Sequence, residues 1–214
     1  MPATIEMRHL DVPPFARVEV AAGLDVLILA GAPQRVSVST SDAETADRVL
    51  AEVHGDTLHL SFRHGLLGWL GGRHINVTVA APDIRGVKAS AGSDVRLSAH
   101  PTPQLDLETA SGSRLLAEQI DCERLLGASA SGSRLVLVGR CDIAELASSS
   151  GSTIEGDRLR AAKIEVQSSS GSHISADAED GARVAASSGS RVDLRGRPGR
   201  FDQQTSSGGS VRIG

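Results

Sequence analysis

The clearest pattern along this chain is an alternation of apolar and polar positions that restarts about every 20 residues. Each period carries the tripeptide Ser-Gly-Ser or a close variant, whose glycine stands at Gly92, Gly112, Gly132, Gly151, Gly171, Gly189 and Gly208. The residues three and five positions after each glycine are mostly apolar, as Leu135 and Leu137 are after Gly132. Such a period of two is typical of a strand with one buried face.

Each period also holds a second alternating stretch before the next glycine, and a weaker apolar segment between the two. Leu105 and Leu107 belong to a second stretch, and Cys141 and Ile143 to a weaker segment. A single short coil cannot bury its own apolar face, whereas stacked coils bury one another's. The repeat therefore predicts an all-β fold, a parallel β-helix with about 20 residues per coil. Crossover chirality favours the right-handed form.

We expect the Ser-Gly-Ser tripeptides to form the corners of the coils. Glycine adopts the backbone conformations that sharp turns need. Serine hydroxyls can bond to corner backbone groups or to the serine one coil away. A serine nucleophile would instead need one serine with a histidine and an acid arranged around it. Equivalent copies in every coil therefore indicate a structural role.

The first 86 residues alternate less regularly and predict an N-terminal, β-rich cap with irregular early coils. Strands are expected at 15–20, 25–29, 35–39, 57–62 and 74–79. Between them, 41–55 predicts one short helix, with Ser41 and Glu44 at capping-box spacing and Gly55 as its C-terminal stop. No linker separates residues 1–86 from the regular coils of 87–214, so we expect one β-helix domain over 1–214.

Several motifs follow one another in a characteristic order. The first is F-x-x-V-x-V followed by G-x-D-V-x-I, carried by Phe15, Val18, Val20, Gly23, Asp25, Val26 and Ile28. Residues 55–62 and 75–84 come next, and then the Ser-Gly-Ser coils. Over about residues 12–214 the chain resembles the putative auto-transporter adhesin, head GIN-domain family of bacterial proteins. The resemblance implies a right-handed β-helix, an exported or envelope-associated protein, and no established enzymatic activity.

Composition narrows the function classes. The formal net charge of −4 gives no basic field for nucleic acid, and the 2% aromatic content argues against base-stacking platforms. No apolar run reaches the length of a membrane helix. Residues 1–20 lack the apolar run of a signal peptide, so a cytoplasmic location stays open beside the exported one. Nothing in the sequence indicates a cofactor.

One candidate binding surface lies on the outward positions that follow the Ser-Gly-Ser corners. The basic residues expected on this face are Arg96, Arg114, Arg134, His173, Arg191 and Arg212. Guanidinium groups suit phosphate, sulfate or acidic glycans, so we name these residues the arginine stripe. The alternative is a solvated charged face balanced by Glu155 and Asp193. The second stretch instead points acidic residues outward, at Asp106, Glu108, Glu145 and Glu165.

A second candidate is the glycine-rich connection 64–74, which holds the apolar residues Leu66, Leu67, Trp69 and Leu70. These side chains are expected either to cover the solenoid or to dock on a second copy, a partner or a membrane surface. His54, His59, His64 and His74 are expected to lie apart in loops and strands rather than to form a metal site. Cys122 and Cys141 should lie in adjacent coils, as free buried thiols or as a disulfide.

The sequence thus favours a non-catalytic, adhesion-type β-helix scaffold of the bacterial cell envelope. Its expected partners are a protein, a glycan or a second copy, reached through the 66–70 loop or the solenoid faces. The alternative is a structural protein that assembles end to end, and a polysaccharide-active enzyme is the third choice. Acidic clusters of the kind that hold Ca²⁺ in β-helix lyases do not occur on the predicted face.

Overall fold

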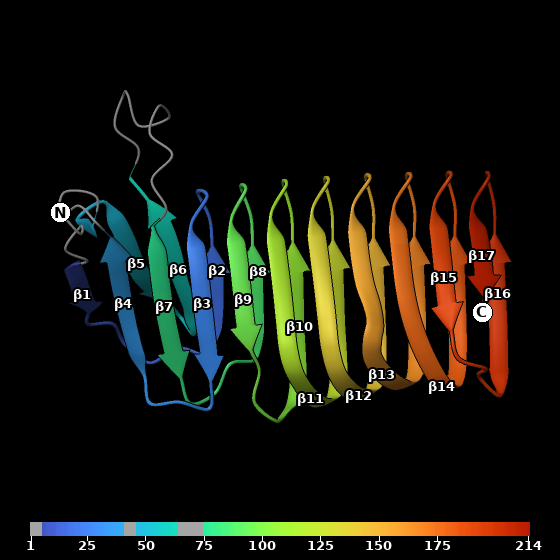
Figure 1. Ribbon diagram of the computed structural model, residues 1–214, viewed down its shortest axis with the longest axis horizontal. Coiled ribbons are helices and arrows are strands. Elements are labelled where there is room, and N and C mark those ends of the chain that lie inside the picture. The colour runs from blue at the N-terminus through green and yellow to red at the C-terminus, as the bar shows by residue number, and fades with distance from the viewer. Residues whose placement is uncertain (1–5, 41–45, 64–74) are drawn as a thin grey trace, which may run out of the picture.

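The protein is a row of stacked β-coils (Figure 1), seen in a computed structural model that describes residues 6–40, 46–63 and 75–214. The early strands are β1 (Glu6–Leu10), β2 (Arg17–Val20), β3 (Asp25–Ala30), β4 (Arg35–Thr40), β5 (Val49–His54), β6 (Thr57–Phe62), β7 (Asn76–Ala81), β8 (Gly86–Ala89) and β9 (Asp94–Ser98). The later strands are β10 (Thr102–Thr109), β11 (Arg114–Ser129), β12 (Arg134–Ser148), β13 (Thr153–Ser168), β14 (His173–Ala186), β15 (Arg191–Arg195), β16 (Arg200–Thr205) and β17 (Ser210–Ile213).

Each regular coil runs through two sheets and a bend. In β12, residues 134–136 pair with the starts of β11 and β13, and residues 143–148 pair with their ends. We call the two layers the first sheet, built from the strands that follow the Ser-Gly-Ser corners, and the second sheet, built from those that precede them. Residues 139–141 and their counterparts form a short third face at the bend. The two strong strands and the weaker third segment expected from the sequence are therefore confirmed.

Register within the sheets follows the repeat. Leu135 pairs with Leu115 on one side and Ile154 on the other, and all three side chains are buried. The core between the two sheets consists almost wholly of such aliphatic columns. The core is closely packed around Gly127 of the second sheet, where an added Cβ would lie 2.8 Å from Leu146 Cδ2. Because Gly127 has no side chain, the neighbouring leucine can occupy this space.

The corners are tight turns whose two central residues both have positive φ. Ser111 and Gly112 have φ of 53° and 72°, and the Ser113 N–H donates to the Ala110 carbonyl 3.3 Å away. Positive φ at both central positions is characteristic of a type I′ turn. The Gly112 N–H donates to the carbonyl of Ser131 in the next corner at 3.1 Å, so the corners are also bonded to one another.

In several corners the second serine is buried, and its hydroxyl lies within hydrogen-bond distance of two carbonyl oxygens. Ser152 Oγ lies 2.6 Å from the Ser149 carbonyl oxygen of its own corner and 2.6 Å from the Ser129 carbonyl oxygen of the preceding coil. Ser152 Oγ also lies 2.9 Å from Ser148 Oγ. The Ser129 and Ser149 carbonyls also accept backbone N–H groups, so the hydroxyl adds a further contact to each of them at the edge of the core.

We expect Ser152→Ala to lower the free energy of unfolding by about 1–3 kcal/mol, because it removes a buried hydrogen bond and takes away the hydroxyl partner of the buried Ser148 Oγ. Ser150→Ala is the matched control, since Ser150 lies exposed in the same turn. Urea denaturation of both variants measures the difference. Equal stabilities would contradict a role for the buried hydroxyl.

The first coil of the chain is not the first coil of the stack. β2 pairs with β6 on one side and β8 on the other, and β3 pairs with β7 and β9. The coil formed by β2 and β3 is therefore inserted between β6–β7 and β8–β9, which follow it in the sequence. Figure 1 shows β3 between β7 and β9.

Antiparallel strands close the N-terminal end. β1 pairs with β4, β4 with β7, and β5 with β6, all antiparallel. The cap is thus confirmed, but the helix expected over 41–55 is wrong where the structure describes it, because Val49–His54 is strand β5. Residues 41–45 lie outside the described residues. The pairing of β5 with β6 in a hairpin provides hydrogen bonds that outweigh the weak helical pattern.

The C-terminal end carries its last strands at the outside of the stack. In the described chain, β16 pairs with β14 and β17 with β15. Gln203 continues the column of Val166 and Val184, so a polar side chain ends an otherwise aliphatic row. On the first sheet the row ends with Ile213, which is 49% exposed.

Candidate binding surface

Four shallow hollows lie side by side on the outer face of the second sheet, with volumes of about 470–790 Å³. Glu145, Glu165 and Gln167 each line more than one of them, so the hollows are continuous. Together they extend from Arg17 on β2 to Asp202 on β16, across successive coils. We call this surface the second-sheet trough. The sequence analysis did not identify it.

The floor of the trough is a column of outward side chains at equivalent positions in consecutive coils. This floor column consists of Ala128, Ala147, Gln167, Ala185 and Gln204, which are paired in register. Each of them points away from the core and is followed by the last inward residue before a corner. Three of the five are alanines, so the sheet is hollowed where they lie. Alanine at this outward position in three coils is the sequence signal for the trough.

The rims of the trough are charged, and the charges pair across neighbouring coils. Arg124 forms an ion pair with Glu145, and the Lys88 Nζ–Glu108 Oε2 distance is 3.7 Å. The acidic outward residues expected on these strands are thus present, but basic neighbours offset part of their charge. Exposed pairs of this kind add little stability.

One rim contact spans three coils. The Arg17 side chain lies across Gly86 and reaches Asp106, with Nη2 and Oδ2 2.7 Å apart. A Cβ at residue 86 would lie 2.7 Å from Arg17 Nη1, so glycine is needed for this path. Asp106 in turn accepts a hydrogen bond from Gln104 at 2.8 Å. The N-terminal end of the trough is therefore held in a fixed shape.

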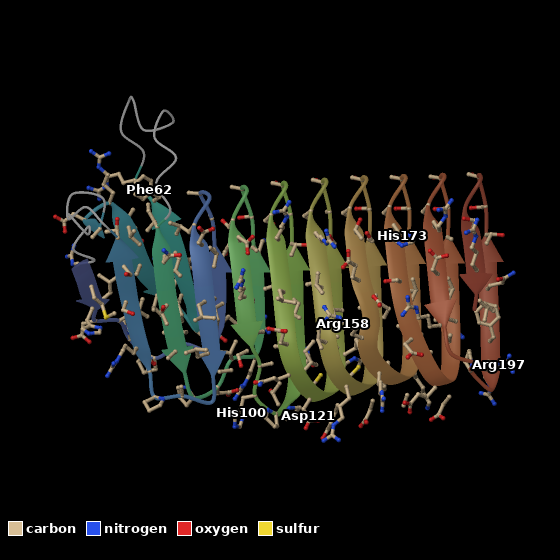
Figure 2. All side chains as sticks on the ribbon, viewed as in Figure 1. Phe62, His100, Asp121, Arg158, His173 and Arg197 are labelled. Atoms are coloured by element: carbon tan, nitrogen blue, oxygen red, sulfur yellow. The ribbon has the colours of Figure 1, made fainter. Side chains whose placement is uncertain are left out.

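The arginine stripe lies on the opposite side, on the first sheet, and it falls into two columns. Arg114 and Arg134 are direct neighbours, and His173 and Arg191 continue their column beyond Thr153. His173 is labelled on the first sheet in Figure 2. Arg96 and Arg212 stand at opposite ends of the adjacent column. That column also contains Leu116, Val136, Glu155, Ser175 and Asp193.

Acidic neighbours engage two residues of the stripe. Arg134 pairs with Glu155, with Nη2 and Oε1 2.5 Å apart, and His173 Nε2 lies 3.6 Å from Asp193 Oδ2. Among the residues that the structure describes, Arg96, Arg114, Arg191 and Arg212 form no ion pair. The stripe is thus an interrupted row of cations, and anion binding by it stays a prediction.

The remaining sequence candidates are only partly described. Leu66, Leu67, Trp69 and Leu70 lie outside the described residues, as do His64 and His74. His54 and His59 were expected to lie apart, but their ring centroids are 5.1 Å apart, because the β5–β6 hairpin brings them together. His59 Nδ1 also lies 3.3 Å from Glu19 Oε2.

The third face carries two cross-coil pairs next to each other. Arg140 and Asp121 form a two-point ion pair with N–O distances of 2.8 and 3.1 Å, which lowers the pKa of the Asp121 carboxyl. Asp121 is labelled at the bend of its coil in Figure 2. The next residues, Cys122 and Cys141, are also paired, and both are buried free thiols.

The family described as putative auto-transporter adhesin, head GIN domain, matches residues 14–198. The chain belongs to this family. The family resemblance inferred from the ordered motifs is therefore confirmed. A search of curated proteins found no match.

Crystal structures of bacterial proteins share the fold of this head GIN domain. A putative adhesin from Bacteroides fragilis is 19% identical, with a TM-score of 0.86 over 98% of this chain and 97% of its own. A putative lipid binding protein from Parabacteroides distasonis is 14% identical, with a TM-score of 0.77 over 100% and 98% of the two chains. A putative adhesin from the same species is also 14% identical and has a TM-score of 0.75 over the same shares. At such identities the likeness shows the fold alone.

The family to which the chain belongs is thus adhesin-like, which suggests an exported or envelope protein. In the described residues, no helix is long and apolar enough to span a membrane.

Proposed function

We propose that the protein is a non-catalytic, adhesin-type scaffold of the bacterial cell envelope that binds an extended ligand along the second-sheet trough. The observation that carries this proposal is the floor column, in which alanines of several coils lie in register and adjoining hollows form one elongated site rather than separate pockets. We also propose that the coil is right-handed, because connections between parallel strands of one sheet are nearly always right-handed. A polymer such as a glycan or an extended polypeptide fits an elongated surface better than a compact metabolite does.

A stiff site suits this role. Each floor strand is hydrogen-bonded to its neighbours along the sheet, so the trough is organised before the ligand arrives. A preorganised surface loses less conformational entropy on binding. The paired rim charges support binding rather than catalysis, because Arg17 and Asp106 are engaged with each other. The relatives described as putative adhesins support the same class of function.

End-to-end assembly has weaker support than trough binding. The outer edge of β17 and the exposed Ile213 favour it. Gln203 and Thr205 oppose it, because inward-pointing polar residues on β16 are a common protection of sheet edges against further strands.

We expect Ala147→Trp to abolish binding, or to weaken it by at least about tenfold, because an indole in the middle of the floor column would fill the trough. Ala147 is exposed and points away from the core, so the coil should stay folded. The measurement is binding of labelled protein to a glycan array, to immobilised host matrix proteins and to phospholipid vesicles.

Thr153→Trp is the matched control, because Thr153 points outward from the first sheet in the adjacent coil. This variant should bind like the unmodified protein. Equal binding by the unmodified protein and Ala147→Trp would exclude the trough as the site. A loss with Thr153→Trp alone would favour the first sheet, and no binding to any of the surfaces would argue against an adhesin-type role.

A further inference from the structure

The two cysteines of the chain meet on the third face. Cys122 in β11 and Cys141 in β12 are its only cysteines and are directly paired in register. Their side chains are 8% and 6% exposed. Directly opposite residues on adjacent strands point to the same side of a sheet, so the two thiols share one small space.

This placement meets the geometric requirement for a disulfide. Adjacent strands lie about 4.8 Å apart, within the range of roughly 4.4–6.8 Å that disulfides span between Cα atoms. The same column continues with Ala161 and Ala178, where no thiol is present. The sequence therefore places sulfur at two successive coils of this column, between Thr102 on one side and Ala161 on the other.

The cysteine pair also lies beside the least regular part of the ladder. Between β11 and β12 the register shifts from Ala117 to Ile120. Gln119 has a φ of 60° and Gly139 a φ of 144°, so the backbone leaves the extended conformation on both strands. A covalent bond would join the coils where backbone pairing is interrupted, next to the ion pair of Asp121 and Arg140.

We propose that Cys122 and Cys141 are a modification site at which a disulfide oxidant joins two adjacent coils covalently. The inference goes beyond the binding function and does not depend on the ligand. Disulfides form in oxidising compartments such as the bacterial periplasm. An envelope protein would meet the oxidant there, before or while the buried coil closes.

The reaction is an exchange with a low-molecular-weight or protein disulfide, RSSR. The Cys122 thiolate attacks one sulfur of RSSR, forming a mixed disulfide and releasing RS⁻. Cys141 then loses its proton and its sulfur attacks Cys122 Sγ, which forms the intramolecular S–S bond and releases the second RS⁻. The oxidant gains two electrons and leaves as two thiols. In the folded coil the interaction with Cys141 lowers the pKa of the Cys122 thiol and raises that of Cys141.

The test is to refold the full chain with glutathione disulfide and to compare it with chain refolded under reductant. We expect a mass lower by two hydrogen atoms, no alkylation of either cysteine in denaturant, and a monomer on a non-reducing gel. The oxidised protein should melt about 5–10 °C above the reduced one, since the bond closes a loop of about 20 residues. The Cys122→Ala/Cys141→Ala variant should fold and show no response to the oxidant.

A second variant tests the register. In Cys122→Ala/Ala161→Cys, the thiols at 141 and 161 are paired in the same column, so the same cross-link should form one coil later. Two free thiols in the oxidised, refolded chain would overturn the proposal. Dimers linked between chains, or a disulfide that lowers the melting temperature, would overturn it as well.

Discussion

Leu135→Ala is expected to lower the free energy of unfolding by about 2–5 kcal/mol, as truncations of fully buried leucines do. Leu135 is 0% exposed and is the middle member of the column Leu115–Leu135–Ile154. It also packs over Gly127 of the opposite sheet, where an added Cβ would be 3.4 Å from Leu135 Cδ2. Hydrogen-bonded strands on both sides limit the collapse of the resulting cavity.

Val136→Ala is the matched control, because Val136 is the next residue of the same strand and points outward. Its loss should cost less than about 1 kcal/mol, since most surface substitutions have small effects. Chemical denaturation followed by circular dichroism compares the two variants. A Leu135→Ala protein no less stable than Val136→Ala would contradict the register of the first sheet.

The regular coils could be predicted because their determinants are local and repeated. The period of two in residues 134–138 indicates which side chains point inward. The spacing of the glycines predicts which strands are neighbours. Arg114 and Arg134 stand at the same place in successive repeats, and for this reason they pair directly. The corner at Ser131 and Gly132 follows from the preference of glycine for positive φ.

The N-terminal part depends on pairing between segments far apart in the sequence. Ala46, Val49, Leu50 and Val53 match one face of a helix, but Val49, Ala51 and Val53 also alternate as a strand does. The strand forms because this segment pairs with β6 in a hairpin, and no local sequence pattern predicts that hairpin. Likewise, nothing near residues 17–30 indicates that their coil is inserted between two later ones.

The trough could not be predicted from the sequence because it depends on no chemically distinctive side chain. The arginines of the first sheet suggest anion binding by their chemistry, whereas the trough results from the short side chains of Ala128, Ala147 and Ala185. A small neutral residue has no distinctive chemistry by itself. Only its recurrence at one outward position, on strands that the structure places side by side, produces a groove.

Gly139→Ala is the substitution expected to disturb the backbone most, with a loss of about 3–5 kcal/mol in the free energy of unfolding. Gly139 has a φ of 144°, a region that residues with a side chain avoid. A Cβ there would lie 2.2 Å from the Ile120 carbonyl oxygen and 2.6 Å from the Ile120 nitrogen. Because both contacts are backbone atoms of the adjacent strand, β11 and β12 would have to separate at the third face.

Gly132→Ala is its matched control in the same coil. Gly132 also has a positive φ, 68°, but an added Cβ would meet no atom within 4 Å. The free energy of unfolding of this variant should fall by only about 1–2 kcal/mol, the cost of a left-handed backbone conformation for a residue with a side chain. Urea denaturation should therefore rank Gly139→Ala well below Gly132→Ala in stability.

In Gly139→Ala, the separated strands should also expose Cys122 and Cys141, so both thiols should react faster with a maleimide in the reduced, native protein. Equal stabilities and unchanged thiol reactivity would show that the strands at the third face are not in close contact at Gly139.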